Sequence, residues 1–106
     1  MKVGNYEVYW KHVNRKEEDR EAYFKAKKED IPIPPSKSYT ECLIVDETTG
    51  EIISARRAYC SHMDNFNKKI GRKISFARAV DNIAYKNLRE DLWSELKRIS
   101  PKTLRS

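Results

Sequence analysis

The chain has 106 residues, of which 22 are Ile, Leu, Val or Phe, so it forms at most one domain with a small core. A core of this size leaves little room for a deep catalytic cleft, and we expect a protein that is not an enzyme. No apolar run reaches the about 18 residues of a membrane span, and the start MKVGNYEVYW lacks the apolar region of a signal peptide, so we expect a cytoplasmic protein.

The net charge of +6 is concentrated in one segment of the chain. Residues 56–78 contain seven Lys or Arg and one acid, Asp64, which gives this segment alone a charge of +6. The rest of the chain holds 15 of the 22 basic and 15 of the 16 acidic residues, so it is balanced. A localised positive field attracts anions, which makes this segment the first candidate binding surface.

The N-terminal third predicts a short strand followed by a charged helix. The stretch YEVYWKHV, residues 6–13, alternates in the manner of a strand, with one side formed by Tyr6, Val8, Trp10 and His12. Residues 16–30 are charged nearly all round and indicate a surface helix, and IPIPPS, residues 31–36, favours an extended connector. We therefore expect an N-terminal strand and helical arm over residues 1–35, joined to the main part of a single domain over 36–106.

Residues 39–59 predict a β-hairpin, because two β-branched runs surround the glycine-containing turn DETTGE. Alternation along the first strand places Cys42 and Ile44 on the same face. Arg56 and Arg57 are consecutive in the return strand and point to opposite faces, so only one of them lies beside the helix that follows.

Two C-terminal helices are expected to pack on this hairpin. The first begins near Ser61, where S-x-x-D forms a capping box with Asp64. Its predicted core stripe consists of Met63, Phe66, Ile70, Ile74 and Ala77. Its predicted solvent side consists of Asn65, Lys68, Lys69, Arg72 and Phe76. After a break near Asp81, the second helix has the stripe Tyr85, Leu88, Leu92, Leu96 and Ile99. The predicted fold is α+β, with a small antiparallel sheet made by the hairpin and the N-terminal strand.

The predicted solvent side of the first helix combines cations with an aromatic ring, as phosphate neutralisation and base stacking require. The candidate ligand-binding residues are Arg56, Arg57, Tyr59, Lys68, Lys69, Arg72, Lys73, Phe76 and Arg78. In this interpretation the arginines and lysines hold phosphate, and Phe76 or Tyr59 stacks on a base. The alternative is a solvated charged face with Phe76 packed beneath the arm.

No metal or cofactor is expected. A zinc site would draw on Cys42, Cys60, His62 and either Asp64 or His12, but only Cys60 and His62 are close in the sequence, whereas structural zinc sites have two close ligand pairs. Cys60, His62 and Asp64 are two residues apart, a spacing that does not bring helical side chains face to face for nucleophilic catalysis. The two cysteines are expected to be reduced thiols.

Gly71 lies inside the first predicted helix, where glycine costs about 1 kcal/mol relative to alanine. Two explanations remain open. The glycine allows either the close approach of a neighbouring element or the approach of a ligand between Lys68 and Arg72.

The order C-x3-D-x-F-x4-G-R-x5-R after a hairpin is carried by Cys60, Asp64, Phe66, Gly71, Arg72 and Arg78. This pattern resembles small accessory proteins encoded by phages, among them the Thoeris anti-defence sponges. The resemblance implies an antiparallel sheet followed by C-terminal helices, assembly into dimers or larger oligomers, and sequestration of a cyclic nucleotide in the host cytoplasm.

Three functions remain open at this point. The first is non-enzymatic sequestration of an anionic nucleotide as a phage anti-defence protein, which a small pocket would favour. The second is a DNA- or RNA-binding module, which a flat or grooved cationic patch would favour. The third is inhibition of a host nucleic-acid-binding defence protein, which an apolar anchor among the cations would favour. The apolar stripe of the last helix also predicts a homodimer or higher homo-oligomer.

Overall fold

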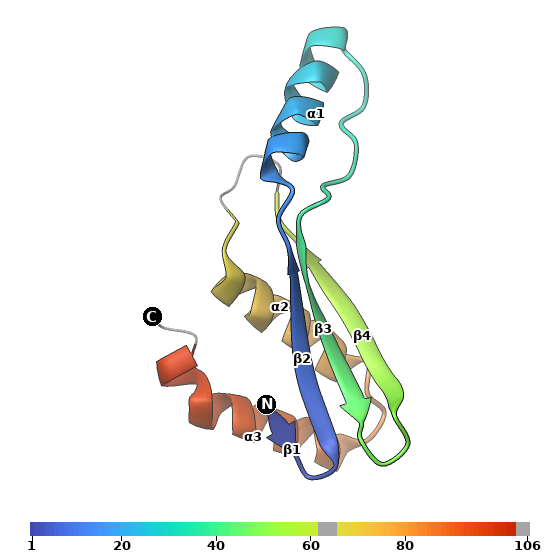
Figure 1. Ribbon diagram of the computed structural model, residues 1–106, viewed down its shortest axis with the longest axis vertical. Helices are drawn as coiled ribbons and strands as arrows, with labels where there is room; N and C mark the ends of the chain where they lie inside the picture. The colour runs from blue at the N-terminus through green and yellow to red at the C-terminus, as the bar shows by residue number, and fades with distance from the viewer. Residues whose placement is uncertain (62–65, 104–106) are drawn as a thin grey trace.

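The computed structural model describes residues 1–61 and 66–103, with side chains as far as Arg98. The elements are β1 (Lys2–Val3), β2 (Tyr6–Val13), α1 (Lys16–Glu29), β3 (Tyr39–Asp46), β4 (Glu51–Tyr59), α2 (Lys68–Asp81) and α3 (Lys86–Thr103). The strands form one antiparallel sheet in the order β1-β2-β3-β4. Helices α2 and α3 lie on one side of this sheet, and α1 extends beyond the ends of the strands (Figure 1). The predicted α+β class is confirmed, and no described helix is long and apolar enough to cross a membrane.

The predicted hairpin over residues 39–59 is confirmed. β3 and β4 pair along their lengths, with a bulge between Ile44 and Val45. Thr40, Cys42 and Ile44 are at most 1% exposed. Every second side chain of β3 therefore faces the helices, and the intervening side chains face the other side of the sheet.

The prediction that an N-terminal strand joins the hairpin in one sheet is confirmed, but the predicted N-terminal helical arm within residues 1–35 is wrong. α1 lies between β2 and β3, and these two strands pair with each other from Tyr6↔Asp46 to Val13↔Tyr39. β2 is an inner strand, because β1, which the alternation did not predict, pairs along its other edge. A strand satisfies its backbone hydrogen bonds only beside partners, so α1 and the proline-rich connector form an insertion between two neighbouring strands.

The carboxylate of Asp19 holds the base of this insertion. Asp19 is 1% exposed, and it accepts hydrogen bonds from Ser36 Oγ at 2.9 Å, Lys37 N at 2.8 Å, Ser38 N at 3.2 Å and Ser38 Oγ at 2.7 Å. Burial alone raises the pKa of Asp19, but these hydrogen bonds outweigh it and lower the pKa below its ordinary value. One side chain of α1 thus fixes the return of the chain into β3.

Phe76 lies in the core, so the prediction that it stands on the solvent side of α2 is wrong. It is completely buried, and its ring packs between Trp10 of β2, at a centroid distance of 6.1 Å, and Trp93 of α3, at 5.0 Å. Ala79 and Val80 are buried beside it. The core of this small domain is built on these three rings.

The predicted core stripe of α2 is correspondingly wrong in its central residues. Ile70 is 57% exposed and Ile74 is 40% exposed, whereas Met63 of the same stripe lies outside the described residues. The cause is the close approach of α2 to β3 at Gly71, where an added Cβ would lie 2.3 Å from Thr40 Oγ1. At this separation between α2 and β3 there is no room for a side chain, so the helix places Gly71 against the strand. This orientation leaves Ile70 and Ile74 exposed.

The apolar stripe of α3 belongs to the chain's own core. Leu88, Leu92 and Leu96 are 9%, 0% and 4% exposed and pack in the same cluster as Phe76. The side chain of Ile99 lies outside the described residues. The three leucines therefore offer no uncovered apolar surface, whereas Tyr85 of the same stripe is 72% exposed, and self-association through α3 stays a prediction.

We expect Asp19→Ala to loosen the base of the α1 insertion, at a cost of about 2–3 kcal/mol, because buried donors lose a charged acceptor. Hydrogen exchange of the Lys37 and Ser38 amides should accelerate, while exchange in β4 stays slow. The pKa of Asp19 is lower in the folded protein than in the unfolded chain, so the ionised carboxylate stabilises the fold. This stabilisation is fully present above the unfolded pKa and is lost as the pH falls through the folded pKa. The control is Glu21→Ala at an exposed position of α1; equal acceleration in that variant would contradict the anchoring role.

We expect Gly71→Ala to destabilise the fold by about 1–2 kcal/mol, although alanine favours helix, because the new methyl group overlaps Thr40. Urea unfolding monitored by tryptophan fluorescence measures the effect. Lys73→Ala, at an exposed position of the same helix, should change stability by less than about 0.5 kcal/mol. A Gly71→Ala variant as stable as the wild type would show that α2 does not need this close approach.

Candidate phosphate-binding surface

The first turn of α2 is capped by Asn67 and not by the predicted box of Ser61 and Asp64. The Asn67 side chain accepts hydrogen bonds from the amides of Lys69 at 3.0 Å and Ile70 at 3.1 Å. Asp64 lies outside the described residues. The first turn of α2 contains no acid, so the positive end of the helix dipole adds to the side-chain cations.

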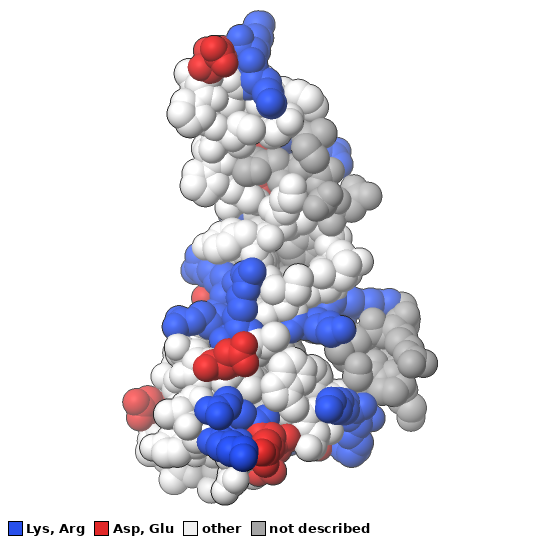
Figure 2. Space-filling model, turned by 180° about the vertical axis from the view of Figure 1, so that it is seen from behind, with Lys and Arg blue, Asp and Glu red and all other residues white. Residues whose placement is uncertain are grey.

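Four cations occupy the N-terminal half of α2, and we refer to them as the α2 cationic surface. They are Lys68, Lys69, Arg72 and Lys73. Lys68 and Lys73 are exposed, and Lys69 and Arg72 are half-buried. The backbone of Arg72 is fixed by Trp10, whose Nε1 donates to the Arg72 carbonyl oxygen at 3.3 Å. Figure 2 shows Lys and Arg side chains gathered across the helical side of the molecule, with acidic side chains beside some of them.

His12 of β2 lies next to the α2 cationic surface. Its Nδ1 is 2.9 Å from Thr40 Oγ1, and its ring meets Phe66 edge-on at a centroid distance of 6.2 Å. Burial lowers the pKa of His12, and the nearby charges of Arg72 and Lys68 lower it further. The imidazole is therefore neutral at neutral pH, and a bound anion would make its protonation more favourable.

The other predicted cations lie on the β4 side of the molecule. Arg56 Nη2 donates to Asn82 Oδ1 at 2.7 Å, near the C-terminal end of α2. Arg78 Nη1 donates to the Arg57 carbonyl oxygen at 2.9 Å, so this side chain joins α2 to β4. β3 separates β2 from β4, so the backbone that carries Arg56 is about 10 Å from the backbone that carries His12. Arg78 lies six residues beyond Arg72 on α2.

Arg57 and Tyr59 lie on the face of the sheet that is turned away from the helices. The Arg57 guanidinium donates to Glu41 Oε2 at 3.0 Å and to the Tyr59 hydroxyl at 3.1 Å, and it lies over the ring of Tyr39 at 4.1 Å. These hydrogen bonds raise the pKa of Arg57. The prediction that Arg56 and Arg57 point to opposite faces is confirmed, and Arg56 is the one on the helical side.

Among the described residues, Cys42, Cys60 and His12 do not form a metal-binding group. Cys42 is buried in the core, where burial raises the pKa of its thiol to about 12, and it is not joined to Cys60 in a disulfide. Within residues 1–61 and 66–98 no group of three His, Cys, Asp or Glu side chains is placed to hold a metal ion. His62 and Asp64 lie outside the described residues.

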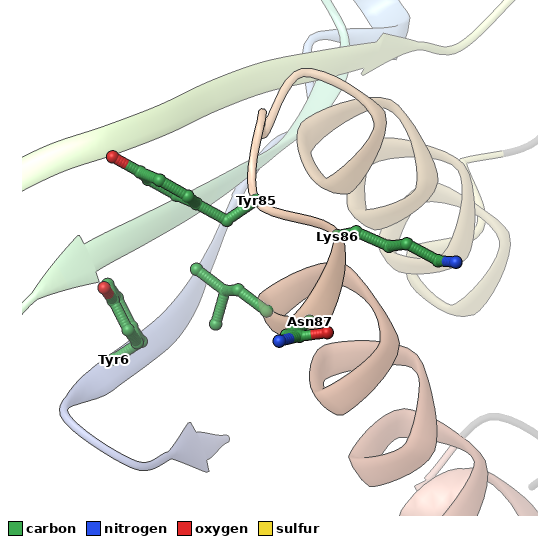
Figure 3. Close-up of a pocket in the computed structure, with 5 residues that line it drawn as sticks. Tyr6, Tyr85, Lys86 and Asn87 are labelled. Atoms are coloured by element: carbon green, nitrogen blue, oxygen red, sulfur yellow. The ribbon is translucent and has the colours of Figure 1, made fainter.

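None of the four hollows described on the surface is lined by a predicted cation. A hollow of about 460 Å³ is lined by Tyr6, Tyr85, Lys86, Asn87 and Leu88. Figure 3 shows the Lys86 side chain directed away from Tyr6 and Tyr85, so this hollow offers no cation to a phosphate beside the rings. A second hollow, of about 360 Å³, contains Tyr59, Ile70 and Ile74 but none of the predicted cations.

Sequence reasoning missed the residues of β2 and β3 that complete these surfaces. The sequence places His12 in the first strand and among the possible metal ligands, and it does not single out His12, Tyr9 or Tyr39 as ligand-binding residues. Tyr9 is 49% exposed on the outer face of β2. The alternation in residues 6–13 contained this information, because a strand that turns Val8 and Trp10 inward must turn Tyr9 outward.

No protein-family model, curated protein or solved structure matches the chain. The resemblance to Thoeris anti-defence sponges therefore stays a prediction, and the function has to be argued from the geometry.

We expect Lys68→Gln to move the pKa of His12 back toward 6.5 without reaching it, because the effects of burial and Arg72 remain. Titration of the imidazole by NMR measures the shift. Since the folded pKa is lowered, the wild type loses stability as the pH falls from 6.5 to the folded value, and the variant should lose less. Lys86→Gln at the start of α3 is the control; an unchanged His12 titration in Lys68→Gln would place Lys68 away from the imidazole.

Proposed function

We propose that the protein binds the phosphate backbone of a nucleic acid through the α2 cationic surface and causes no chemical change in it. The observation that carries this proposal is the open placement of the cations. None of the predicted cations lines the four described hollows, and those of α2 lie on two sides of the helix, with Lys68 and Arg72 near His12 and Arg78 reaching β4. An extended polyanion contacts such a surface along its length, whereas a single nucleotide would leave most of it unused.

The proposal also accounts for an unfavourable arrangement in α2. Lys68 and Arg72 are four residues apart, and so are Lys69 and Lys73, which brings like charges together on a helix. The first turn of α2 has no acid to offset the helix dipole. Each feature destabilises the isolated protein slightly, and phosphate groups relieve both.

Sequestration of a cyclic nucleotide, which the resemblance implies, is the narrower alternative. It loses its stacking partner on α2, because Phe76 is completely buried. Tyr59 remains exposed, but it stands with Arg57 on the opposite face of the sheet from the α2 cationic surface. No single described pocket contains both a predicted cation and an exposed ring of the predicted set.

An acidic protein partner is the second candidate, because Ile70 and Ile74 are exposed next to Lys69 and Lys73. These side chains form an apolar anchor among cations, a combination that suits a protein interface. The double variant Ile70→Ser, Ile74→Ser separates the two candidates. Nucleic-acid affinity should stay within about twofold of the wild type if phosphate contacts dominate, and a large loss would favour the protein partner.

The main test removes two cations of α2, the half-buried Lys69 and the exposed Lys73, and replaces both with glutamine, which also favours helix. Lys69→Gln with Lys73→Gln should weaken binding of labelled DNA and RNA by at least about fivefold in fluorescence anisotropy, and should reduce the slope of log affinity against log salt by about 2. The matched control is Lys25→Gln with Lys28→Gln, which removes the same charge from exposed positions of α1. Equal losses in the two variants, or competition by low micromolar cyclic nucleotide alone, would contradict the proposal.

A further inference from the structure

The face of the sheet that the helices leave uncovered is rich in tyrosine. The strand register arranges its central residues in three rows across β2, β3 and β4, which are Tyr9–Leu43–Ala55, Lys11–Glu41–Arg57 and Val13–Tyr39–Tyr59. Tyr9 is 49% exposed and Tyr59 is 54% exposed. In Figure 1 no helix lies in front of these strands. A merely solvated face of an antiparallel sheet usually carries polar residues at these positions.

Arg57 forms a preordered aromatic and cationic group in the centre of this face. Its guanidinium lies 4.1 Å from the centre of the Tyr39 ring and is held from both sides by Glu41 and the Tyr59 hydroxyl. The Tyr39 and Tyr59 rings are themselves 5.5 Å apart. A planar cation fixed beside two rings presents the surface on which nucleic-acid bases stack.

The acids of this face are already matched by cations. Glu41 accepts from Arg57 at 3.0 Å and stands opposite Lys11 in the strand register. Glu7 lies 3.7 Å from the N-terminal amine. The acids of this face therefore repel a polyanion little, and Lys11 adds an exposed cation beside the tyrosines.

This face connects to α2 around the edge of the sheet. β4 is the edge strand, and Arg78 reaches from α2 to the Arg57 carbonyl oxygen at 2.9 Å. Arg57 and Arg78 therefore place two cations where a phosphate backbone would pass from the helical side to the tyrosines. We propose, on the basis of the function proposed above, that the open face of the sheet stacks the bases of a single-stranded nucleic acid.

The separation of the exposed tyrosines indicates which kind of nucleic acid this face binds. Tyr9 and Tyr59 are two rows and two strands apart, which corresponds to about 17 Å. Rings at this separation contact bases several nucleotides apart, and only an unpaired strand exposes the faces of its bases to side chains. A duplex presents its phosphates to α2 but offers nothing to the tyrosines.

The test compares single-stranded and duplex DNA of about 20 nucleotides in fluorescence anisotropy at fixed salt. Tyr9→Leu and Tyr59→Leu should each weaken single-strand binding about 5- to 100-fold and leave duplex binding unchanged. Tyr9→Phe and Tyr59→Phe keep the rings and should restore most of the affinity. Circular dichroism of each variant verifies that the sheet remains folded.

The outcomes separate this inference from the function on which it rests. Unchanged single-strand binding in both Leu variants, with weakened binding in the Lys69 and Lys73 variant, overturns the stacking surface and leaves phosphate binding intact. No binding of either nucleic acid by the wild type overturns both. Sedimentation that shows a wild-type dimer converted to a monomer by Tyr9→Leu assigns the open face to a second copy of the chain and also overturns the inference.

Discussion

The contact between Gly71 of α2 and Thr40 of β3 determines how the rest of the molecule is arranged. A side chain at position 71 would lie 2.3 Å from Thr40 Oγ1, so the helix backbone rests directly on the strand. This contact fixes the rotation of α2 about its axis. Phe76, Ala79 and Val80 then enter the core, and Ile70, Ile74 and the cations are left outside. The question raised by a glycine inside a helix is answered by packing.

The same rotation makes one helix serve both the core and the charged surface. The side of α2 that carries Phe76 unites β2 and α3 through two tryptophans. The cations begin about two turns earlier, at Lys68, and the first turn of α2 itself contains no acid. Asn67 provides the hydrogen bonds of a cap without adding negative charge. The helix therefore starts securely while its N-terminal end stays positive, which is what an anion-binding surface requires.

The sequence predicted the hairpin and the helix boundaries of α1 well, because alternation and the turn DETTGE are local signals. It failed for α2, where two stripes compete on one helix. The series through Ile70 and Ile74 is regular, but the line through Gly71, Ser75 and Ala79 has the small side chains that a close helix needs, and Ser75 is completely buried. The alternation predicted the strand over residues 6–13 and its place in the sheet, but no local pattern showed that α1 is inserted between two paired strands. The outward direction of Tyr9 could be predicted from the same alternation, whereas the rows that it shares with Tyr39 and Tyr59 depend on the register of the folded sheet.

The contacts around β4 join the α2 cationic surface to the open face of the sheet. They also limit which kind of partner can bind along the β4 edge. An edge strand normally offers its carbonyl and amide groups to another strand. Here Arg78 already donates to the Arg57 carbonyl oxygen, and the Arg57 side chain is held over the open face by Glu41 and Tyr59. An added strand would have to displace Arg78 from the Arg57 carbonyl oxygen, near the C-terminal end of β4. A phosphate needs no such displacement, because each guanidinium has donors beyond those already used. The β4 edge is thus better suited to a passing nucleic-acid backbone than to a fifth strand.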